Sequence, residues 1–460
     1  MYEIDFKNTT FHIHFCGIGG ISMSGLAELL LRRGFSVSGS DRCESPLTSH
    51  LEKLGAKIFY GQCASNIQDF YNLVVMTAAI HPDNEELVAA RAKGIPVLTR
   101  AELLGQIMKQ YPVPVAVSGT HGKTTTTSMI SEILLDAGLD PTLSVGGILK
   151  SIGGNFKIGH SDLFVTEACE YTNSFLSFFP KIEIILNIDA DHLDFFKDLN
   201  DIRHSFHRFA SLLPQDGTLI INGEIPNLCE ITDGIFSKII TFGLTPECNY
   251  YAKNITYDNL ARPTFTLVKD QQECGSYTLG VTGKHNVCNA LSAIAFSQLI
   301  GIEDAKIQKS LHTFSGTERR FEYKGICHGF TIIDDYAHHP TEIAATLSTA
   351  NNYPHKTLWC VFQPHTFTRT KALMKEFAKA LSLSDKIILA DIYPARETDT
   401  LGISSKTLAD EIQKLGKTVY YLPTFEEIEK FILENCIHDD LLITMGAGDI
   451  VKIGEDLLKE

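Results

Sequence analysis

Short apolar runs alternate with stretches of helical periodicity along most of the chain. Near the N-terminus, an apolar run at 11–16 leads into a glycine-rich turn at 17–24, and a helical pattern continues to Arg33. A second apolar run at 35–40 is closed by Asp41. A strand, a helix and a strand in this order predict a β-α-β unit with parallel strands.

The same alternation recurs in the centre and the C-terminal part of the chain. In the centre, strands are predicted at 115–117, 163–166, 182–186, 218–221, 238–242 and 265–268, and helices at 126–137 and 199–213 and in a stretch ending at Ile300. The C-terminal part predicts strands at 331–333, 358–362, 387–389, 419–422 and 441–444, with helices at 341–350, 370–381, 406–415 and 426–433. This pattern is typical of doubly wound α/β domains.

The length of 460 residues corresponds to about three domains. We predict an α/β protein with a Rossmann-like domain at 1–110, a P-loop ATPase-like domain at 111–312 and a second Rossmann-like domain at 313–460. Residues 111–114 are predicted to form a short linker, and each domain is expected to bury its own core.

The composition indicates a soluble globular protein. Hydrophobic residues make up 44%, charged residues 21%, and the formal net charge is −15. An acidic balance argues against binding to bulk nucleic acid. The N-terminal residues show no basic region followed by an apolar stretch, and no apolar run is long enough to cross a membrane. We therefore expect a cytoplasmic protein without membrane insertion.

The eleven cysteines are scattered, and several, such as Cys16 and Cys360, lie inside apolar runs. None belongs to a Cys-x-x-Cys pair. This distribution predicts reduced core residues in a reducing compartment rather than a disulfide framework or a zinc site.

The stretch at 115–125 predicts a phosphate-binding loop. A buried strand leads into Gly119-Thr-His-Gly-Lys-Thr-Thr125, and a helix follows. Glycines let backbone amides approach a polyphosphate, Lys123 supplies positive charge near the outer phosphates, and the Thr124 hydroxyl suits a magnesium ion. The loop is shorter than the generic pattern, because only Thr120 and His121 separate its two glycines. An ordinary turn before a helix is the alternative.

The turn at 17–24 carries an incomplete dinucleotide fingerprint. Gly17 and Gly19 fit it, but Ser22 stands at the third glycine position. The turn indicates a diphosphate at a helix N-terminus, and both NAD and UDP-sugars contain one. A tight turn without a ligand remains the alternative.

Polar residues follow several of the predicted strands, where ligand sites form in α/β sheets. Glu167 and His192 suit magnesium or manganese, with Thr124 and Glu167 at one ion and His192 at a second. His192 could instead only orient its loop, and Glu170 could be a second acid or a surface residue.

Further candidates lie later in the chain. Asn286 and Asn289 could cap a helix or contact adenine and ribose. Paired arginines at 319–320 could clamp a phosphoryl group or be solvated. His338, His339, His365 and Arg369 form a polar group in which the arginine could hold a carboxylate, unless the group is only a solvated rim.

Taken together, these motifs resemble the Mur ligase family over essentially the whole chain. The resemblance rests on the stretches at 17–24, 118–125, 167–170, 187–194, 285–290, 319–322, 334–342 and 363–365. His121 in the phosphate loop resembles the alanine-adding branch, whereas later-acting members tend to carry asparagine there.

The resemblance implies domains for a UDP-sugar, for ATP with Mg²⁺ or Mn²⁺, and for an amino acid. It implies that UDP-N-acetylmuramate is activated as an acyl phosphate and then joined to L-alanine, by a monomer or homodimer. The implied catalytic residues are Lys123, Glu167, His192, Arg320 and His338, and the implied metal ligands are Thr124, Glu167 and His192. The implied ATP contacts are Gly119, Thr120, His121, Gly122, Lys123, Thr124, Thr125, His285, Asn286, Asn289, Arg320 and Asp335. The implied UDP-sugar contacts are Gly17, Gly19, Gly20, Ser22, Ser40, Asp41 and Ser174, and Tyr336, His338 and Arg369 would line the amino-acid site.

Two features depart from the family pattern. Many members carry a carbamylated lysine in the helix after the His192 motif, and this chain has His207 near that place. Cys169 and Tyr171 replace the usual aspartate and serine in the acidic loop. Three other functions stay open: a recycling ligase that adds a preformed tripeptide, a nicotinamide dehydrogenase, and a non-catalytic nucleotide-binding regulator.

Overall fold

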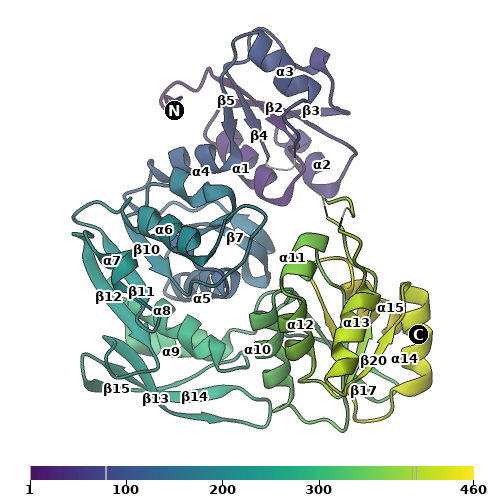
Figure 1. The fold of residues 1–460 in the computed structure, drawn as a ribbon. Helices are drawn as coiled ribbons and strands as arrows, with labels where there is room; N and C mark the ends of the chain where they lie inside the picture. The colour runs from purple at the N-terminus through teal and green to yellow at the C-terminus, as the bar shows by residue number, and fades with distance from the viewer. Residues whose placement is uncertain (1, 78–79, 396, 400, 460) are drawn as a thin grey trace.

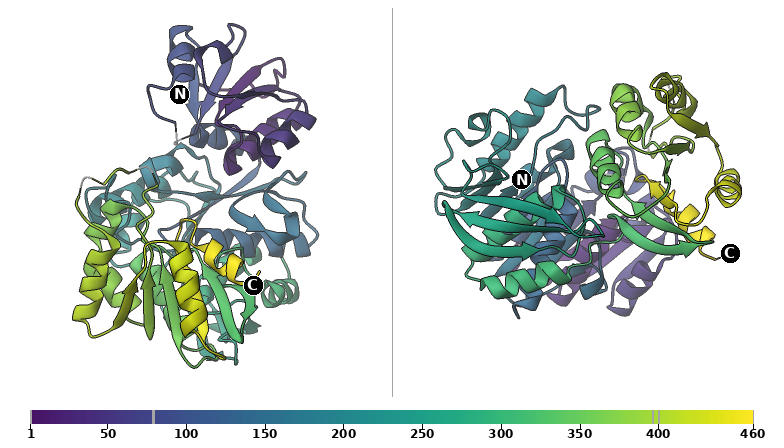
Figure 2. Two further views of the ribbon diagram at one scale, coloured as in Figure 1. Left: turned by 90° about the vertical axis from the view of Figure 1, so that its right-hand side faces the viewer. Right: turned by 90° about the horizontal axis from the view of Figure 1, so that it is seen from below.

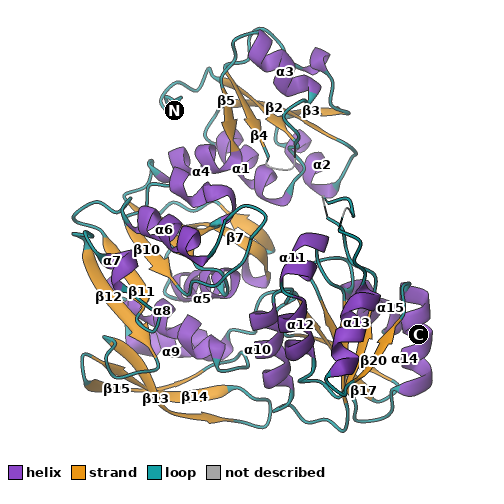
Figure 3. Cartoon of the chain, in the orientation of Figure 1, coloured by secondary structure: helices purple, strands orange, loops and turns teal. Residues whose placement is uncertain are grey.

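The computed structural model describes residues 2–77, 80–395, 397–399 and 401–459. It contains three sheets stacked with helices in three α/β domains (Figure 1). The predicted α/β class is therefore confirmed. Figure 3 shows how helices and strands alternate within each domain. The predicted limits near residues 110 and 312 fall between the sheets and stay predictions.

The N-terminal domain has a parallel five-stranded sheet in the order β3-β2-β1-β4-β5. Its strands are β1 (His12–Cys16), β2 (Ser36–Asp41), β3 (Lys57–Tyr60), β4 (Leu73–Met76) and β5 (Val97–Thr99). Its helices are α1 (Ile21–Arg32), α2 (Pro46–Lys53), α3 (Glu85–Ala92) and α4 (Arg100–Met108), with a 3₁₀ turn at η1 (Ala64–Asn66). The predicted β-α-β unit is β1, α1 and β2.

The middle domain has a ten-stranded sheet in the order β15-β14-β13-β12-β11-β10-β6-β9-β7-β8. Its strands are β6 (Val113–Ser118), β7 (Thr142–Leu149), β8 (Gly154–Lys157), β9 (Leu163–Ala168), β10 (Ile182–Ile185), β11 (Thr218–Asn222), β12 (Lys238–Gly243), β13 (Tyr250–Tyr257), β14 (Pro263–Lys269) and β15 (Gln272–Thr278). Its helices are α5 (Lys123–Asp136), α6 (Leu199–Ala210), α7 (Cys229–Thr232), α8 (His285–Leu299) and α9 (Asp304–Thr313), with 3₁₀ turns at η2 (Lys150–Ile152) and η3 (Tyr171–Ser177).

One prediction for this domain is wrong, and the set of predicted strands is incomplete. The segment 111–114 is no linker, because β6 begins at Val113 and the ring of Tyr111 packs 5.0 Å from that of Phe164. Four strands were not predicted: β7, β8, β13 and β15. They lie toward the sheet edges, and β15 is largely exposed and polar, so no apolar run marks it.

The C-terminal domain has a six-stranded sheet in the order β16-β17-β21-β18-β19-β20, in which only β16 is antiparallel to its neighbour. Its strands are β16 (Glu322–Cys327), β17 (Phe330–Asp335), β18 (Leu358–Phe362), β19 (Lys386–Leu389), β20 (Thr418–Tyr421) and β21 (Leu441–Met445). Its helices are α10 (Pro340–Ala350), α11 (Phe367–Ala372), α12 (Met374–Leu381), α13 (Ser405–Lys414), α14 (Phe425–Asn435) and α15 (Val451–Leu457). The single helix predicted at 370–381 is in fact two, because the backbone leaves helical geometry at Leu373.

The cores do not follow the domains as predicted. One buried apolar cluster runs from the N-terminal sheet, through α4, to one face of the middle sheet, where it includes Phe164, Phe175 and Phe206. The N-terminal domain therefore shares a core with the middle domain, while the other face of the middle sheet and the two faces of the C-terminal sheet have their own clusters. Figure 1 shows the middle and C-terminal domains side by side below the N-terminal one, and the view from below in Figure 2 shows the same two domains next to each other with the N-terminal domain behind them.

Among the described residues, no helix combines the length and the apolar character that a membrane span requires.

Candidate active site

The phosphate loop connects β6 to α5, and its two glycines adopt conformations that favour glycine. Gly119 has φ +139° and Gly122 has φ +83°. A Cβ at Gly122 would come within 2.6 Å of the Asn289 Oδ1 atom, and one at Gly119 would come within 3.2 Å of the Asn187 nitrogen. The glycines therefore serve both the turn and close packing of the loop against neighbouring segments.

The segment after β10 holds this loop in place. Asn187 accepts a hydrogen bond from the His121 backbone nitrogen (2.8 Å) and donates one to the His121 carbonyl (3.0 Å). Thr120 accepts a hydrogen bond from the Asp189 nitrogen at 2.9 Å. The loop is thus ordered by protein contacts.

Lys123 is buried beside a carboxylate. Its Nζ lies 3.0 Å from Glu170 Oε2 and donates to the carbonyls of Gly119 and Thr120. Burial alone would lower the pKa of Lys123, but the Glu170 carboxylate raises it well above its usual value. Lys123 therefore stays charged and points back along its own loop.

Thr124 and Glu167 form an oxygen-rich position next to the lysine. The Thr124 hydroxyl donates to Glu167 Oε2 at 3.1 Å, and the Gly146 amide donates to Oε1 at 2.5 Å. A Cβ at Gly146 would lie 2.5 Å from this carboxylate. A hydroxyl and a carboxylate are ligands that a divalent magnesium or manganese ion prefers, so these residues fit such an ion.

His192 lies on the other side of Glu170. Its Nε2 is 3.8 Å from Glu170 Oε1 and 3.8 Å from Asp191 Oδ2, and its ring lies 4.5 Å from that of Tyr171. The three predicted metal ligands therefore divide between two positions, with Thr124 and Glu167 together and His192 near Glu170.

A cavity of about 470 Å³ opens beside the loop, between the middle and C-terminal domains. Asp335 lines it and accepts hydrogen bonds from the amides of Phe321 (2.8 Å) and Ala337 (2.7 Å). Burial raises the pKa of Asp335 to about 6 despite the nearby charge of Arg320. Eight of the predicted ATP contacts line this cavity: His121, Gly122, Thr125, His285, Asn286, Asn289, Arg320 and Asp335.

Asn286 and Asn289 do not cap α8. The helix begins at His285, its N-cap is Lys284, and no side chain caps it. Asn289 donates to Asn286 Oδ1 at 2.9 Å, and Asn286 donates to the Thr282 carbonyl. Both therefore stand in the cavity wall as a linked pair, which removes capping as their explanation.

A second cavity, of about 490 Å³, lies on the His192 side and is also lined by Asp191, His365 and Arg369. Arg369 Nε donates to Asp191 Oδ1 at 3.1 Å, which joins the C-terminal domain to the middle domain. Burial lowers the pKa of His365 to about 4, so that imidazole is neutral at pH 7.

The three predicted amino-acid contacts are only partly together. Arg369 lines the second cavity, and the ring of His338 lies 5.9 Å from that of His365. Burial also lowers the pKa of His338 to about 4. Tyr336 instead lies under Arg319 and Arg320, each 5.0 Å from its ring.

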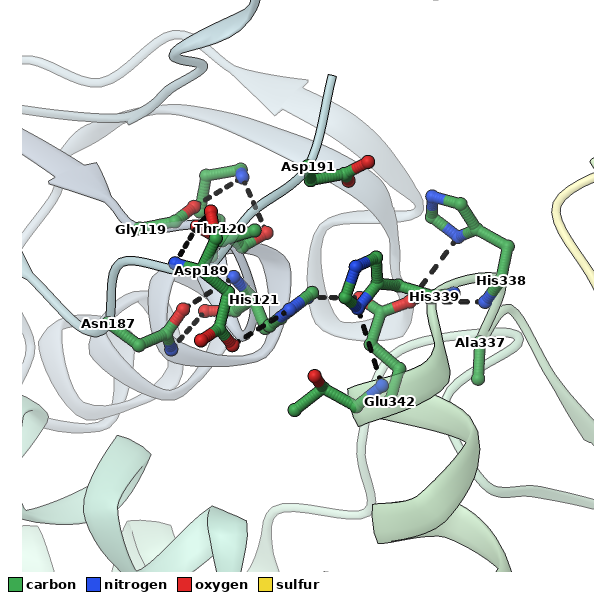
Figure 4. Close-up of polar contacts among 12 residues, drawn as sticks. Gly119, Thr120, His121, Asn187, Asp189, Asp191, Ala337, His338, His339 and Glu342 are labelled. Atoms are coloured by element: carbon green, nitrogen blue, oxygen red, sulfur yellow. Dashed lines mark hydrogen bonds and ion pairs between the residues drawn. The ribbon is translucent and has the colours of Figure 1, made fainter. Parts of the chain in front are cut away.

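His121 connects the loop to the C-terminal domain (Figure 4). Its Nε2 is 3.2 Å from Asp189 Oδ2, and its Nδ1 is 3.1 Å from Glu342 Oε1 in the first turn of α10. Burial lowers the pKa of His121, but the two carboxylates outweigh it and raise the pKa to about 9. Next to it, the His339 ring hydrogen-bonds to the Ala190 carbonyl at 3.2 Å.

Three family descriptions match successive parts of the chain. Residues 12–112 match the family described as "Mur ligase family, catalytic domain". Residues 117–297 match the "Mur ligase middle domain", and residues 319–448 match the "Mur ligase, glutamate ligase domain". The chain belongs to the Mur ligase family. The resemblance predicted from its motifs is confirmed.

Individual relatives cover the whole chain. It is 58% identical to a UDP-N-acetylmuramate–L-alanine ligase of Agathobacter rectalis and 59% identical to one of Lachnospira eligens, each over 460 residues and 100% of both chains. Among solved structures, the UDP-N-acetylmuramate-alanine ligase of Thermotoga maritima has a TM-score of 0.80 at 31% identity, covering 97% of this chain and 98% of that one. A murein peptide ligase of Psychrobacter arcticus has a TM-score of 0.72 at 26% identity, covering 98% of each.

In this Mur ligase, the predicted UDP-sugar residues surround the β1–α1 turn, with the single exception of Ser174. Asp41 accepts a hydrogen bond from the Gly19 amide at 2.7 Å, so its carboxylate supports the turn. Ser40 is fully buried, and its hydroxyl donates to Glu86 at 2.6 Å. Ser174 belongs to η3 of the middle domain, where its hydroxyl donates to the Tyr171 carbonyl.

The paired arginines have separate roles in the structure. Arg319 forms an ion pair with the buried Asp334 at 3.0 Å and donates to the carbonyls of Gly446 and Gly448, so it ties the C-terminal domain together. Arg320 faces the first cavity. His207, the residue near the place of the carbamylated lysine, hydrogen-bonds to the Ile231 carbonyl and so joins α6 to α7.

Four residues of the site were not predicted as site residues: Asn187, Asp189, Asp191 and Glu342. All lie within motifs that follow strands, at 187–194 and 334–342. Their strand-end positions were a signal, but their partners are far away in sequence, and the partners of Asp191 and Glu342 belong to another domain.

Proposed function

We propose that the chain is an ATP-dependent ligase that joins L-alanine to the carboxylate of UDP-N-acetylmuramate, with release of ADP and phosphate. The full-length identity of 58–59% to relatives that carry this name supports the choice of substrates. A cytoplasmic enzyme that is a monomer or homodimer fits this role.

The link between the two cavities is the observation that carries the proposal. The phosphate loop lines the first cavity. Lys123 of this loop contacts Glu170, and Glu170 lies 3.8 Å from His192, which lines the second cavity. ATP in the first cavity would therefore place its γ-phosphate toward the second. A substrate carboxylate bound in the second cavity would then lie next to the γ-phosphorus atom. Binding both reactants in this way would raise the rate by holding the reacting atoms close together.

The reaction has two steps. A carboxylate oxygen of the muramoyl group attacks the γ-phosphorus, the bond to the ADP oxygen breaks, and an acyl phosphate forms. Lys123 and Arg320 stabilise the negative charge on the transferred group. The alanine amine then attacks the carbonyl carbon, and phosphate leaves from the tetrahedral intermediate.

Thr124 and Glu167 would hold a divalent cation, with His192 at a second position. Such an ion supplies charge compensation to the phosphates. The predicted ATP contacts that line the first cavity would bind the rest of the nucleotide, with Asp335 at the ribose and Asn289 near the base.

The amino acid would occupy the second cavity, where Arg369 can hold its carboxylate once the pair with Asp191 rearranges. Alanine must lose a proton before its amine attacks. That proton passes to solvent, because His338 and His365, whose pKa values burial lowers to about 4, are too weakly basic to remove it. As neutral imidazoles they would instead orient the amine through a hydrogen bond.

ADP release with UDP-N-acetylmuramate tests the proposal. We expect release with L-alanine and little with a preformed tripeptide. The opposite result would identify the recycling ligase, which the similarity to a murein peptide ligase keeps as the second candidate. Tight NADH binding without UDP-sugar binding would instead favour a dehydrogenase.

Substitution of Lys123 in the phosphate loop distinguishes an enzyme from a non-catalytic nucleotide-binding regulator. Lys123→Ala should lower turnover by about 10³-fold or more. Lys181→Ala is a matched control, because Lys181 pairs with Asp216 at the surface, away from both cavities. Unchanged turnover in Lys123→Ala would contradict the assigned role of the loop.

A further inference from the structure

The N-terminal domain contains a buried cluster of a histidine, a cysteine and a glutamate. His14 and Cys16 lie two positions apart on β1 and therefore point to the same face of the sheet. Glu86 reaches them from the first turn of α3. All three side chains have no solvent exposure. One ligand atom from each lies within 4.8 Å of the other two, the only such group among the described residues.

The His14 ring presents an unpartnered nitrogen to this cluster. Its Nδ1 contacts the Ser38 hydroxyl at 2.9 Å, which fixes the ring orientation. Its Nε2 is buried, has no hydrogen-bond partner within the described part of the chain, and lies 3.8 Å from Glu86 Oε1. A buried polar atom without a partner costs free energy, and a histidine held at one nitrogen with the other free has the arrangement of a metal ligand.

Two hydrogen bonds hold the Glu86 carboxylate in place beside His14. Ser40 donates to its Oε2 and Asn66 to its Oε1, each at 2.6 Å. Burial would raise the pKa of Glu86, but these hydrogen bonds and the nearby His14 lower it, so the carboxylate is ionised. Burial raises the pKa of the Cys16 thiol, and Glu86 adds to this effect. A bound cation would reverse that effect and displace the thiol proton.

We propose that His14 Nε2, Cys16 Sγ and a Glu86 carboxylate oxygen bind one Zn²⁺ ion beneath the glycine-rich β1–α1 turn. Imidazole, thiolate and carboxylate are the ligands of protein zinc sites, and three of them leave the fourth tetrahedral position to a water molecule. One thiolate and one carboxylate neutralise the charge of the ion, which makes its burial favourable. The ion would brace β1 against α3. This position is separate from the Thr124–Glu167 position in the middle domain.

Cobalt provides a spectroscopic test on the full-length protein. With Mg²⁺ in excess to occupy the ATP site, we expect one tightly held Co²⁺ per chain and a near-ultraviolet charge-transfer band from the thiolate. Zinc should displace the cobalt, abolish the band and raise the melting temperature. Absence of the band in the wild-type protein would overturn the proposal and identify the cluster as a His14–Glu86 pair without metal.

Matched variants locate the ion. Cys16→Ala should lose the band, whereas Cys360→Ala should keep it, because Cys360 is equally buried in β18 but outside the cluster. A band that persists in Cys16→Ala would contradict the assignment. Should Cys16→Ala fail to fold, X-ray absorption of the zinc-loaded wild-type protein decides. One sulfur with nitrogen and oxygen ligands supports the site, and any other number of sulfurs rejects it.

Discussion

The middle domain contacts its two neighbours through interfaces of opposite character. Toward the N-terminal domain the contact is apolar, because one hydrophobic cluster includes residues of both domains. At Gly105 of α4 there is no room for a Cβ, which would lie 1.9 Å from the Ser177 carbonyl oxygen. Toward the C-terminal domain the contacts are polar, formed by Glu342 and Arg369, and the two cavities lie there.

We call the interface with the N-terminal domain the apolar joint and the interface with the C-terminal domain the polar joint. The difference indicates that the apolar joint is rigid and that the polar joint can open. A shared close-packed core has a single best arrangement, since separating it exposes apolar area to water. Ion pairs and hydrogen bonds can exchange for water or ligand at lower cost. We therefore expect the N-terminal and middle domains to move as one body, while the C-terminal domain opens to admit substrates.

Truncation inside the apolar joint should have the largest effect. Phe175 is fully buried in η3 and stacks on Phe209 with ring centroids 4.4 Å apart. Phe175→Ala should lower the free energy of unfolding by about 3–5 kcal/mol, as measured by denaturant titration. Phe236→Ala is the control, because Phe236 is 84% exposed, and its effect should be below about 0.5 kcal/mol. Equal effects would refute the shared core.

The polar joint should respond to alkaline pH through His121. Its pKa is raised to about 9, above the ordinary value of about 6.5. The stabilisation is therefore complete below about pH 6.5 and is lost as the pH rises through about 9, a change of at most about 3 kcal/mol. Hydrogen exchange of α10 and the phosphate loop should accelerate over this range. Glu342→Gln should reduce the response, and an unaltered response would exclude this contact as its source.

The pair between Arg369 and Asp191 should contribute less. Asp191→Asn removes one charge of this buried pair and should loosen the C-terminal domain at a cost of about 2 kcal/mol. Small-angle scattering should show a larger radius of gyration without ligands. Asp216→Asn, at the surface pair with Lys181, is the comparison and should leave the radius unchanged.

The smallest effect should come from Glu183, a residue of β10 whose carboxylate is fully buried and has no hydrogen-bond partner among the described residues. Burial raises its pKa well above the ordinary value. The contribution of Glu183 to the free energy of unfolding is therefore most favourable below the pKa of this group in the unfolded chain. It is lost as the pH rises through the raised pKa of the folded protein. Glu183→Val should stabilise the protein by about 1 kcal/mol at neutral pH and remove this pH dependence. A destabilised variant would show that the carboxyl has an unseen partner.

Local pattern was sufficient for most elements. β18 begins and ends at the predicted residues, because a continuous apolar run bounded by polar residues marks a buried strand. The exposed strand β15 and the break at Leu373 escaped prediction, since neither changes the apolar periodicity enough.

The sequence by itself determined the α/β class, the phosphate loop and the family, because these depend on residues close together in the chain. Only the tertiary structure decided which partners those residues meet. It joined His121 to Glu342, separated Arg319 from Arg320, and merged the cores of the first two domains. It also placed Glu86 beside His14 and Cys16. Such contacts depend on how whole sheets pack, and no local spacing encodes the distance between residues on different elements.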